Sequence, residues 1–171
     1  MIHSEHPFRP EPGDRDLARQ FRGRLVAGVT IVTAGFGSDR TGLTISSLLV
    51  IQGEPAQAHI VVSPATDLWS VASKTGRFVI HVCRYDDRHL ADVFAGLWPS
   101  PGGLFATVDA TESKWGPVLT DLPDRAYCSF VSGDEVGWSG LIVGSIDEVE
   151  VSDLEDPMVH YRSGYRRLLA P

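Results

Sequence analysis

The chain has 171 residues, of which 43% are hydrophobic and 22% are charged, and its formal net charge at pH 7 is −7. This length suits one domain, and the composition is ordinary for a globular protein. A protein that binds duplex nucleic acid needs a basic surface to replace phosphate counterions, so the acidic balance argues against a nucleic acid partner. A small phosphorylated cofactor stays compatible with it.

The cysteines and the lengths of the apolar runs indicate the cellular compartment. Cys83 and Cys128 lie far apart within apolar runs, which is typical of buried free thiols in a reducing cytoplasm. No apolar run approaches the ~18 residues that span a bilayer, and the N-terminal stretch is polar rather than a signal peptide. We therefore predict a cytoplasmic protein without a membrane segment. The six histidines show no metal-ligand spacing, so no metal site is predicted.

The first half of the chain is predicted to form an arm, a short helix and then strands. Residues 1–13 hold three prolines and no periodicity and predict a flexible arm; residues 14–171 form the predicted domain. Asp14 is a plausible N-cap for a short helix. The β-branched apolar runs predict strands. The predicted elements here are a helix over 15–24, a strand over 26–33, a turn over 35–40, and strands over 42–51 and 58–63.

The second half mixes short helices with strands. Thr66 is placed to cap a helix that ends at Gly76, the position where glycine closes helices, and Asp87 is placed to cap another. Residues 96–125 are rich in Gly, Pro and Ser and predict one long loop that is either functional or a partner contact. Its aromatic residues between Trp98 and Trp115 are candidates to cover a ligand. The remaining predicted elements are helices over 67–74 and 88–95 and strands over 77–83, 126–131, 139–151 and 158–162, with a last short element over 165–169.

This order of elements predicts the fold class. Six or seven strands with a few inserted helices do not make a βαβ pattern, and no G-x-G-x-x-G follows a strand, so a dinucleotide-binding Rossmann domain is disfavoured. The sequence instead predicts a mainly β fold, a barrel or sandwich with short inserted helices.

The segment 42–47 carries the strongest sign of chemistry. Side chains alternate along a strand, so Thr44 and Ser46 share one face while Ile45 and Ser47 share the other. Hydroxyls fill a core poorly unless each finds a partner. They either lie on an exposed strand face or line a cleft that receives a polar heterocycle and its phosphate.

The order of several short motifs resembles one family. Residues 28–33, 42–47, 76–80 and 94–95 match its G-V-T-V-V-T, G-x-T-x-S-S, G-x-F-x-V and F-A patterns, Ser63 and Thr66 match S-x-x-T, and residues 156–165 resemble its closing P-L-x-Y-x-x-G-x-Y. This ordered set, over about residues 17–169, is similar to the flavin reductases of the FMN-binding split barrel, the reductase components of two-component monooxygenases.

The resemblance implies a fold, a cofactor and a reaction. The fold is an FMN-binding split barrel that pairs into a homodimer, with the flavin cleft at or near the interface. The implied cofactor is FMN or FAD, held non-covalently and reduced by hydride from NAD(P)H, and the implied partner is an oxygenase. By position, residues Thr44, Ile45, Ser46 and Ser47 contact the isoalloxazine edge, and Ser63 and Thr66 lie near the phosphate. Thr66 is equally explained as an N-cap.

Departures from the family pattern leave alternatives open. His81 stands where the family often has asparagine, and it either packs at a strand edge or contacts the flavin. The family's later G-D-H histidine, associated with the nicotinamide, is missing, which favours an alternative: a flavin-binding electron carrier without NAD(P)H reductase activity. A split-barrel relative that binds a deazaflavin or haem is a third reading. His160 and Tyr161 in the closing motif are interpreted as packing residues.

Overall fold

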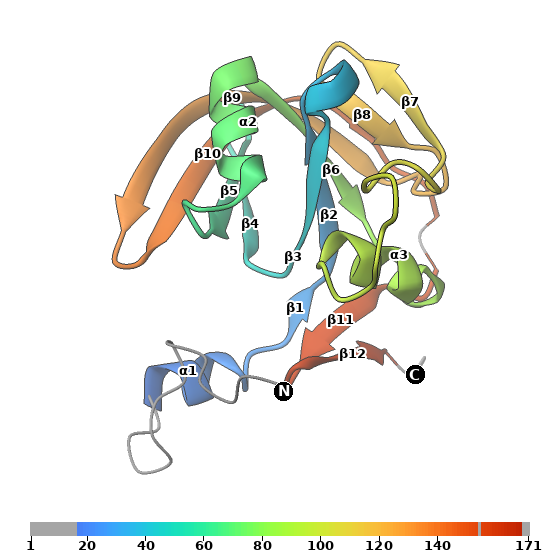
Figure 1. Ribbon diagram of the computed structural model, residues 1–171. Helices are drawn as coiled ribbons and strands as arrows, with labels where there is room; N and C mark the ends of the chain where they lie inside the picture. The colour runs from blue at the N-terminus through green and yellow to red at the C-terminus, as the bar shows by residue number, and fades with distance from the viewer. Residues whose placement is uncertain (1–16, 154, 169–171) are drawn as a thin grey trace, which may run out of the picture.

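The structure is a computed structural model that describes residues 17–153 and 155–168 (Figure 1). The predicted arm over residues 1–13 lies outside the described residues. Most of the strands form one antiparallel seven-stranded sheet in the order β3-β2-β6-β9-β10-β5-β4. The strands of this sheet are β2 (Thr30–Ala34), β3 (Thr41–Ile45), β4 (Leu48–Ile51), β5 (Gln57–Val62), β6 (Arg77–Val82), β9 (Arg125–Val136) and β10 (Ser139–Glu150).

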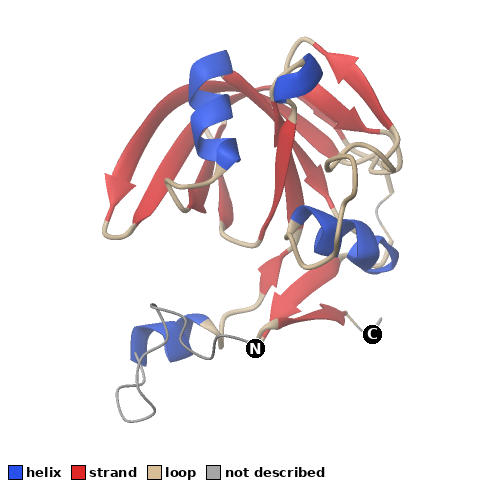
Figure 2. Ribbon diagram, viewed as in Figure 1, coloured by secondary structure: helices blue, strands red, loops and turns tan. Residues whose placement is uncertain are grey.

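Smaller elements surround this sheet (Figure 2). A second sheet has the order β1-β11-β12, and β7 pairs with β8. Their bounds are β1 (Ala27–Gly28), β7 (Ala110–Ser113), β8 (Gly116–Leu119), β11 (Met158–Tyr161) and β12 (Gly164–Arg167), and the helices are α1 (Leu17–Arg22), α2 (Asp67–Thr75) and α3 (Arg88–Phe94). Short 3-10 turns, η1 (Gly37–Asp39) and η2 (Tyr85–Asp87), precede β3 and α3. The predicted mainly β class with short inserted helices is confirmed.

The connection between β3 and β4 explains why the sheet curls. These strands form the two opposite edges of the sheet, yet only Ser46 and Ser47 separate them in the chain. Because a residue spans at most ~3.6 Å, the two edges must come close together. The sheet therefore bends into a barrel that is split between β3 and β4, and the predicted single strand over 42–51 is wrong: it breaks where the chain passes from one edge to the other.

The inner face of the curled sheet holds the main core. Ile60, Phe78 and Ile142 are fully or almost fully buried there, and α2 closes the core with Leu68 and Ala72. Gly144 on β10 leaves the space that the Phe78 ring fills, because a Cβ there would lie 2.3 Å from the ring. Apolar burial on this scale is the main force that holds the barrel.

Helix α2 begins and ends as the sequence predicts. The Thr66 hydroxyl accepts a hydrogen bond from the Trp69 amide (3.4 Å), and Gly76 closes the helix in the left-handed conformation with φ of 72°. The expected cap of α3 is different. The Asp87 carboxylate accepts from the Arg84 amide (2.7 Å) and from the Arg84 guanidinium (3.0 Å) instead of from α3, because it closes η2 rather than the helix.

A second core packs β1, α3 and β11 beneath the sheet. Val29, Cys83 and Met158 are buried together there, and their backbones are interlocked: the Val29 amide donates to Met158, the Cys83 amide to Val29 and the Met158 amide to Cys83, each at 3.0 Å. These bonds attach the β11–β12 hairpin to the barrel. They place this hairpin opposite the strand break, which is where the pocket described below opens.

The prediction of a single loop over 96–125 is wrong. This segment contains the β7–β8 hairpin, which the weak alternation of its short strands did not reveal. Trp115 is buried against Tyr127, with ring centroids 4.8 Å apart, and its indole N–H donates to Asp147 (2.8 Å). Trp115 is therefore part of the barrel wall and is not available to cover a ligand; Trp98, 57% exposed, is.

Within the described ranges, no helix combines the length and the apolar character that crossing a bilayer requires. In the same residues, no three His, Cys, Asp or Glu side chains lie close enough together to hold a metal ion.

Candidate functional site

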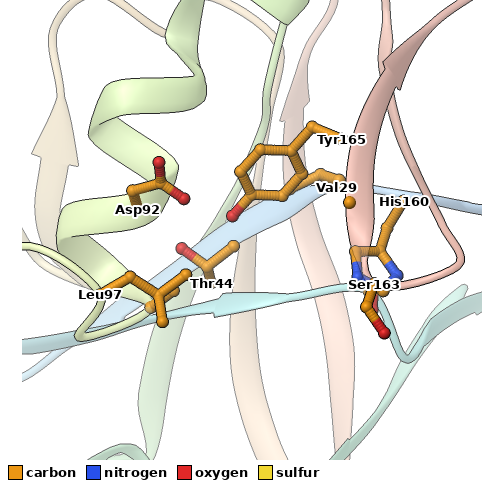
Figure 3. A pocket seen from close by; sticks show the side chains of 10 residues that line it. Val29, Thr44, Asp92, Leu97, His160, Ser163 and Tyr165 are labelled. Atoms are coloured by element: carbon orange, nitrogen blue, oxygen red, sulfur yellow. The ribbon is translucent and has the colours of Figure 1, made fainter.

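A pocket of about 290 Å³ opens at the split of the barrel (Figure 3). The end of β3 and the strand break form one side, α3 and the residues after it form a second, and the β11–β12 hairpin forms a third. Val29, Ala95 and Leu97 give apolar walls. The polar groups that line it are Thr44, Ser46, Asp92, His160, Ser163 and Tyr165.

The hydroxyls of Thr44, near the end of β3, and of Ser46, in the strand break, differ in the hydrogen bonds that they can still make with a ligand. The Thr44 hydroxyl donates to the Ala91 carbonyl (2.6 Å), which ties β3 to α3. A hydroxyl has one proton and two lone pairs, so Thr44 can only accept a hydrogen bond from a ligand. Within the described residues the Ser46 hydroxyl has no hydrogen-bond partner, so it can donate and accept. Thr44 and Ser46 both line the pocket, although Ser46 lies just beyond the end of β3.

Tyr165 and Asp92 meet across the pocket. Figure 3 shows the Tyr165 hydroxyl pointing between Asp92 and Thr44. Burial raises the pKa of Tyr165 to about 12, with further contributions from the Asp92 charge and from the hydrogen bond to Asp92. The phenol therefore keeps its proton at neutral pH, and its hydroxyl is directed toward the Asp92 carboxylate.

The turn between β11 and β12 presents the remaining polar groups. Arg162 and Ser163 are its central residues, with φ of 48° and 60°, the pair of left-handed conformations that a two-residue type I′ hairpin turn requires. Non-glycine residues adopt this conformation at a cost of about 1–2 kcal/mol each. The turn sets Ser163 at the pocket, and the β11–β12 register pairs His160 with Tyr165, whose ring centroids are 6.3 Å apart.

Ser47, Ser63 and Thr66 lie beside the pocket rather than in its lining. Ser47 bridges to β5: its hydroxyl donates to the Val61 carbonyl (2.6 Å), and its own carbonyl accepts from the Val61 amide (2.9 Å). Ser63 follows β5 directly, so the strand break and the turn before α2 adjoin. The Thr66 hydroxyl donates to the Ser63 carbonyl (2.8 Å), and the Ser63 hydroxyl accepts from the Ala65 amide (3.3 Å).

Ile45 and His81 belong to the interior of the fold. Ile45 is 3% exposed and packs in the barrel core. His81 is fully buried; its Nδ1 donates to the Ile31 carbonyl (3.1 Å), and its Nε2 accepts from the Leu119 amide (3.1 Å). Burial lowers the pKa of His81 to about 4, so the ring is neutral and both nitrogens are used. The structure places this imidazole in a packing role, away from the pocket lining.

Sequence reasoning missed half of the pocket. His160 was interpreted as a packing residue, yet it lines the pocket, and Tyr165 and Ser163 join it there. The closing motif over 156–165 was the signal for all three. Asp92 had no signal, because it stands between buried residues of a short helix and only the contact of α3 with β3 and β12 turns it to the pocket.

Sequence comparison identifies relatives along almost the whole chain. The model of the family described as "Flavin reductase like domain" matches residues 22–169. The reductase component of a 4-hydroxyphenylacetate 3-monooxygenase from Thermus thermophilus is 27% identical over 92% of this chain and 99% of its own. An NADH-dependent FMN reductase from Streptomyces nodosus subsp. asukaensis is 26% identical over 94% of this chain and 88% of its own.

Solved structures share the fold. An NADH:FAD oxidoreductase of Streptomyces globisporus, solved in complex with NAD and FAD fragments, superposes with a TM-score of 0.81 at 22% identity and covers 94% of this chain and 96% of its own. The split barrel, its hydroxyl-bearing strand break and the family match over residues 22–169 agree. The chain belongs to the flavin reductase like domain family.

Proposed function

We propose that this protein is a reductase that binds FMN non-covalently, passes hydride to it from NADH and supplies the reduced flavin to an oxygenase. The observation that carries this proposal is the pocket at the strand break, where Thr44 and Ser46 face apolar walls. Relatives of 26–27% identity are named as an NADH-dependent FMN reductase and as a monooxygenase reductase component. These names favour the reductase over an electron carrier that NADH does not reduce.

The pocket suits the edge of a flat, largely apolar ring that carries polar atoms. Val29, Leu97 and the Tyr165 ring offer apolar surface, and Thr44 and Ser46 offer hydrogen bonds. The volume of about 290 Å³ is at the lower end of the ~300–1,000 Å³ of small-molecule pockets, so part of a flavin extends beyond it. Bound flavin supplies the redox chemistry, and the protein supplies orientation and access.

We place the flavin phosphate at the turn before α2. The Ser63 hydroxyl accepts from Ala65 and keeps its own proton to donate. The single proton of the Thr66 hydroxyl goes to the Ser63 carbonyl, and the Trp69 amide donates to its oxygen, so Thr66 holds the turn and has no proton left to donate to a phosphate. Free amides at the start of a helix favour an anion, and α2 offers them beside Ser63. Ile45 and Ser47 then contribute through their backbone, and His81 contributes only support.

We infer a homodimer from the exposed apolar surface of the sheet edge. Leu49, Val50 and Ile51 of the edge strand β4 are 69%, 59% and 45% exposed, and Trp138 at the tip of the β9–β10 hairpin is 99% exposed. Monomeric proteins protect such edges. Light scattering on the purified protein is expected to give twice the mass of the chain, and the mass of one chain would contradict the inference. The two free, buried thiols suit a cytoplasmic location.

The experiment that tests the reductase proposal is a stopped-flow record of NADH absorbance with and without FMN. Protein with FMN is expected to consume NADH at least about a hundredfold faster than free FMN does, as positioned hydride donors and acceptors allow. The S46V variant, altered in the pocket, is expected to lose most of this acceleration, whereas the S47V variant, altered outside it, keeps it. A protein that binds FMN but does not accelerate the reaction is the electron carrier instead.

A further inference from the structure

The described lining of the pocket carries a negative charge without a lysine or arginine to balance it. Asp92 is the one carboxylate among the residues that line it in the described chain, and no lysine or arginine lines it. The arginines of the hairpin and of α3 lie outside the lining, and each contacts another group. Arg162 lies over the Tyr161 ring (5.4 Å), Arg166 donates to the backbone carbonyl of Tyr165 (2.8 Å), Arg167 pairs with Asp156, and Arg88 pairs with Asp86 (3.6 Å). A ligand in this pocket therefore meets the negative charge of Asp92 with no lysine or arginine in the described lining beside it.

The Asp92 charge is held in place. The half-buried Tyr165 hydroxyl points toward the carboxylate, and the helix that carries Asp92 is anchored by the Thr44 hydroxyl, which donates to the neighbouring Ala91 carbonyl (2.6 Å). Figure 3 shows Asp92 directed to the same space as Thr44 and Tyr165. A fixed carboxylate in a partly enclosed cavity acts on a bound charge more strongly than one in open water.

The two redox forms of flavin differ in charge at the ring. The oxidised ring is neutral, whereas the two-electron-reduced ring readily loses a proton near neutral pH and becomes an anion. Resting on the reductase function proposed above, we propose that Asp92 makes this pocket bind oxidised flavin more tightly than reduced flavin, so that the product is expelled toward an acceptor. Asp92 is thus a specificity-determining residue for the redox state of the cofactor.

The test compares the dissociation constants of FMN and of dithionite-reduced FMN, the second measured without oxygen, at a pH above the range in which histidines ordinarily titrate. The natural protein is expected to bind reduced FMN about tenfold more weakly, equal to about 1.4 kcal/mol. D92N keeps the shape and the acceptor for Tyr165 but removes the charge, and it is expected to bring the two constants within about twofold. Equal constants in the natural protein overturn the proposal.

Two controls separate charge from packing. Y165F removes the hydroxyl that points toward Asp92 and keeps the carboxylate, and it is expected to retain the difference between the two constants. E148Q removes a carboxylate that pairs with Lys114 on the surface (3.5 Å), and it is expected to change nothing. A D92N ratio equal to that of the natural protein contradicts the role of Asp92, while oxidised FMN that fails to bind the natural protein at all contradicts the reductase proposal itself.

A second measurement does not depend on any variant. A tenfold preference for the oxidised form lowers the midpoint potential of bound flavin by about 30 mV relative to free FMN, because the couple transfers two electrons. Spectroelectrochemical titration of the natural protein with FMN is expected to show this decrease. A bound potential equal to or above that of free FMN overturns the proposal.

Discussion

Polar side chains in the barrel interior and polar side chains at its split obey different rules. His81 in the interior uses both ring nitrogens on backbone groups. Thr66, at the start of α2, likewise uses its proton and a lone pair within its own turn. At the split, Ser46 has no partner among the described residues, and His160 faces the pocket. Residue type therefore does not identify the site, whereas side chains with unused hydrogen-bonding capacity do.

The largest effect is expected at His81, and it concerns stability. The folded protein holds the pKa of His81 at about 4, below the ordinary 6.5, so the unfolded chain takes up a proton first as pH falls. The contribution of the neutral His81 ring to the free energy of unfolding is complete above pH 6.5. It falls by about 3 kcal/mol as pH decreases toward 4. Urea unfolding between pH 4 and 7.5 measures it. H81Q is expected to remove most of this pH dependence while leaving the protein less stable at pH 7.5.

The same residue is expected to have little direct effect on the ligand. Because the ring lies away from the pocket lining, folded H81Q at pH 7.5 is expected to bind FMN within about threefold of the natural protein. A loss of FMN affinity beyond tenfold in a folded H81Q, by flavin fluorescence titration, would place this histidine in the site.

At Ser46 the expected effect is on binding. S46V removes a hydroxyl that can both donate and accept, and it adds apolar bulk to the pocket. Its dissociation constant for FMN is expected to rise about tenfold or more, about 1.4 kcal/mol, with the free energy of unfolding within about 0.5 kcal/mol of the natural value. Flavin fluorescence titration and urea unfolding measure the two quantities. A variant that loses stability but not affinity would show that Ser46 belongs with the interior group.

Thr66 is expected to behave in the opposite way. T66A deletes the N-cap of α2 and is expected to cost about 1 kcal/mol of unfolding free energy, while FMN affinity changes by about twofold at most. T66S restores the hydroxyl and is expected to recover the stability. A T66A variant of natural stability with weakened FMN binding would mean that this hydroxyl contacts the phosphate directly.

The smallest effect is expected at Ser63. S63A removes one donor to the phosphate and is expected to weaken FMN about threefold to fivefold, which is typical of one hydrogen bond. Riboflavin, which has no phosphate, is the matched ligand and is expected to bind S63A and the natural protein equally. Equal losses for both ligands would place Ser63 at the ring rather than at the phosphate.

What the sequence could predict follows the range of the interactions. Helix α2 was predictable because Thr66 and Gly76 are local signals. Strand alternation suggested that Thr44 and Ser46 lie on one side, and both line the pocket, although Ser46 lies just beyond the end of β3. The break at Ser46 and Ser47 was not, since it follows from β3 and β4 forming opposite edges of the sheet. Asp92 acquires its place only through the contact of α3 with β3 and β12, which no local pattern encodes.

The central claim is that the pocket at the strand break receives the flavin ring, and a crystal structure of the protein with FMN tests it most directly. The flavin ring is expected to contact Ser46 and Tyr165, and the phosphate is expected beside Ser63 at the start of α2. A flavin seated anywhere that leaves Thr44, Ser46 and Tyr165 without contact would contradict it.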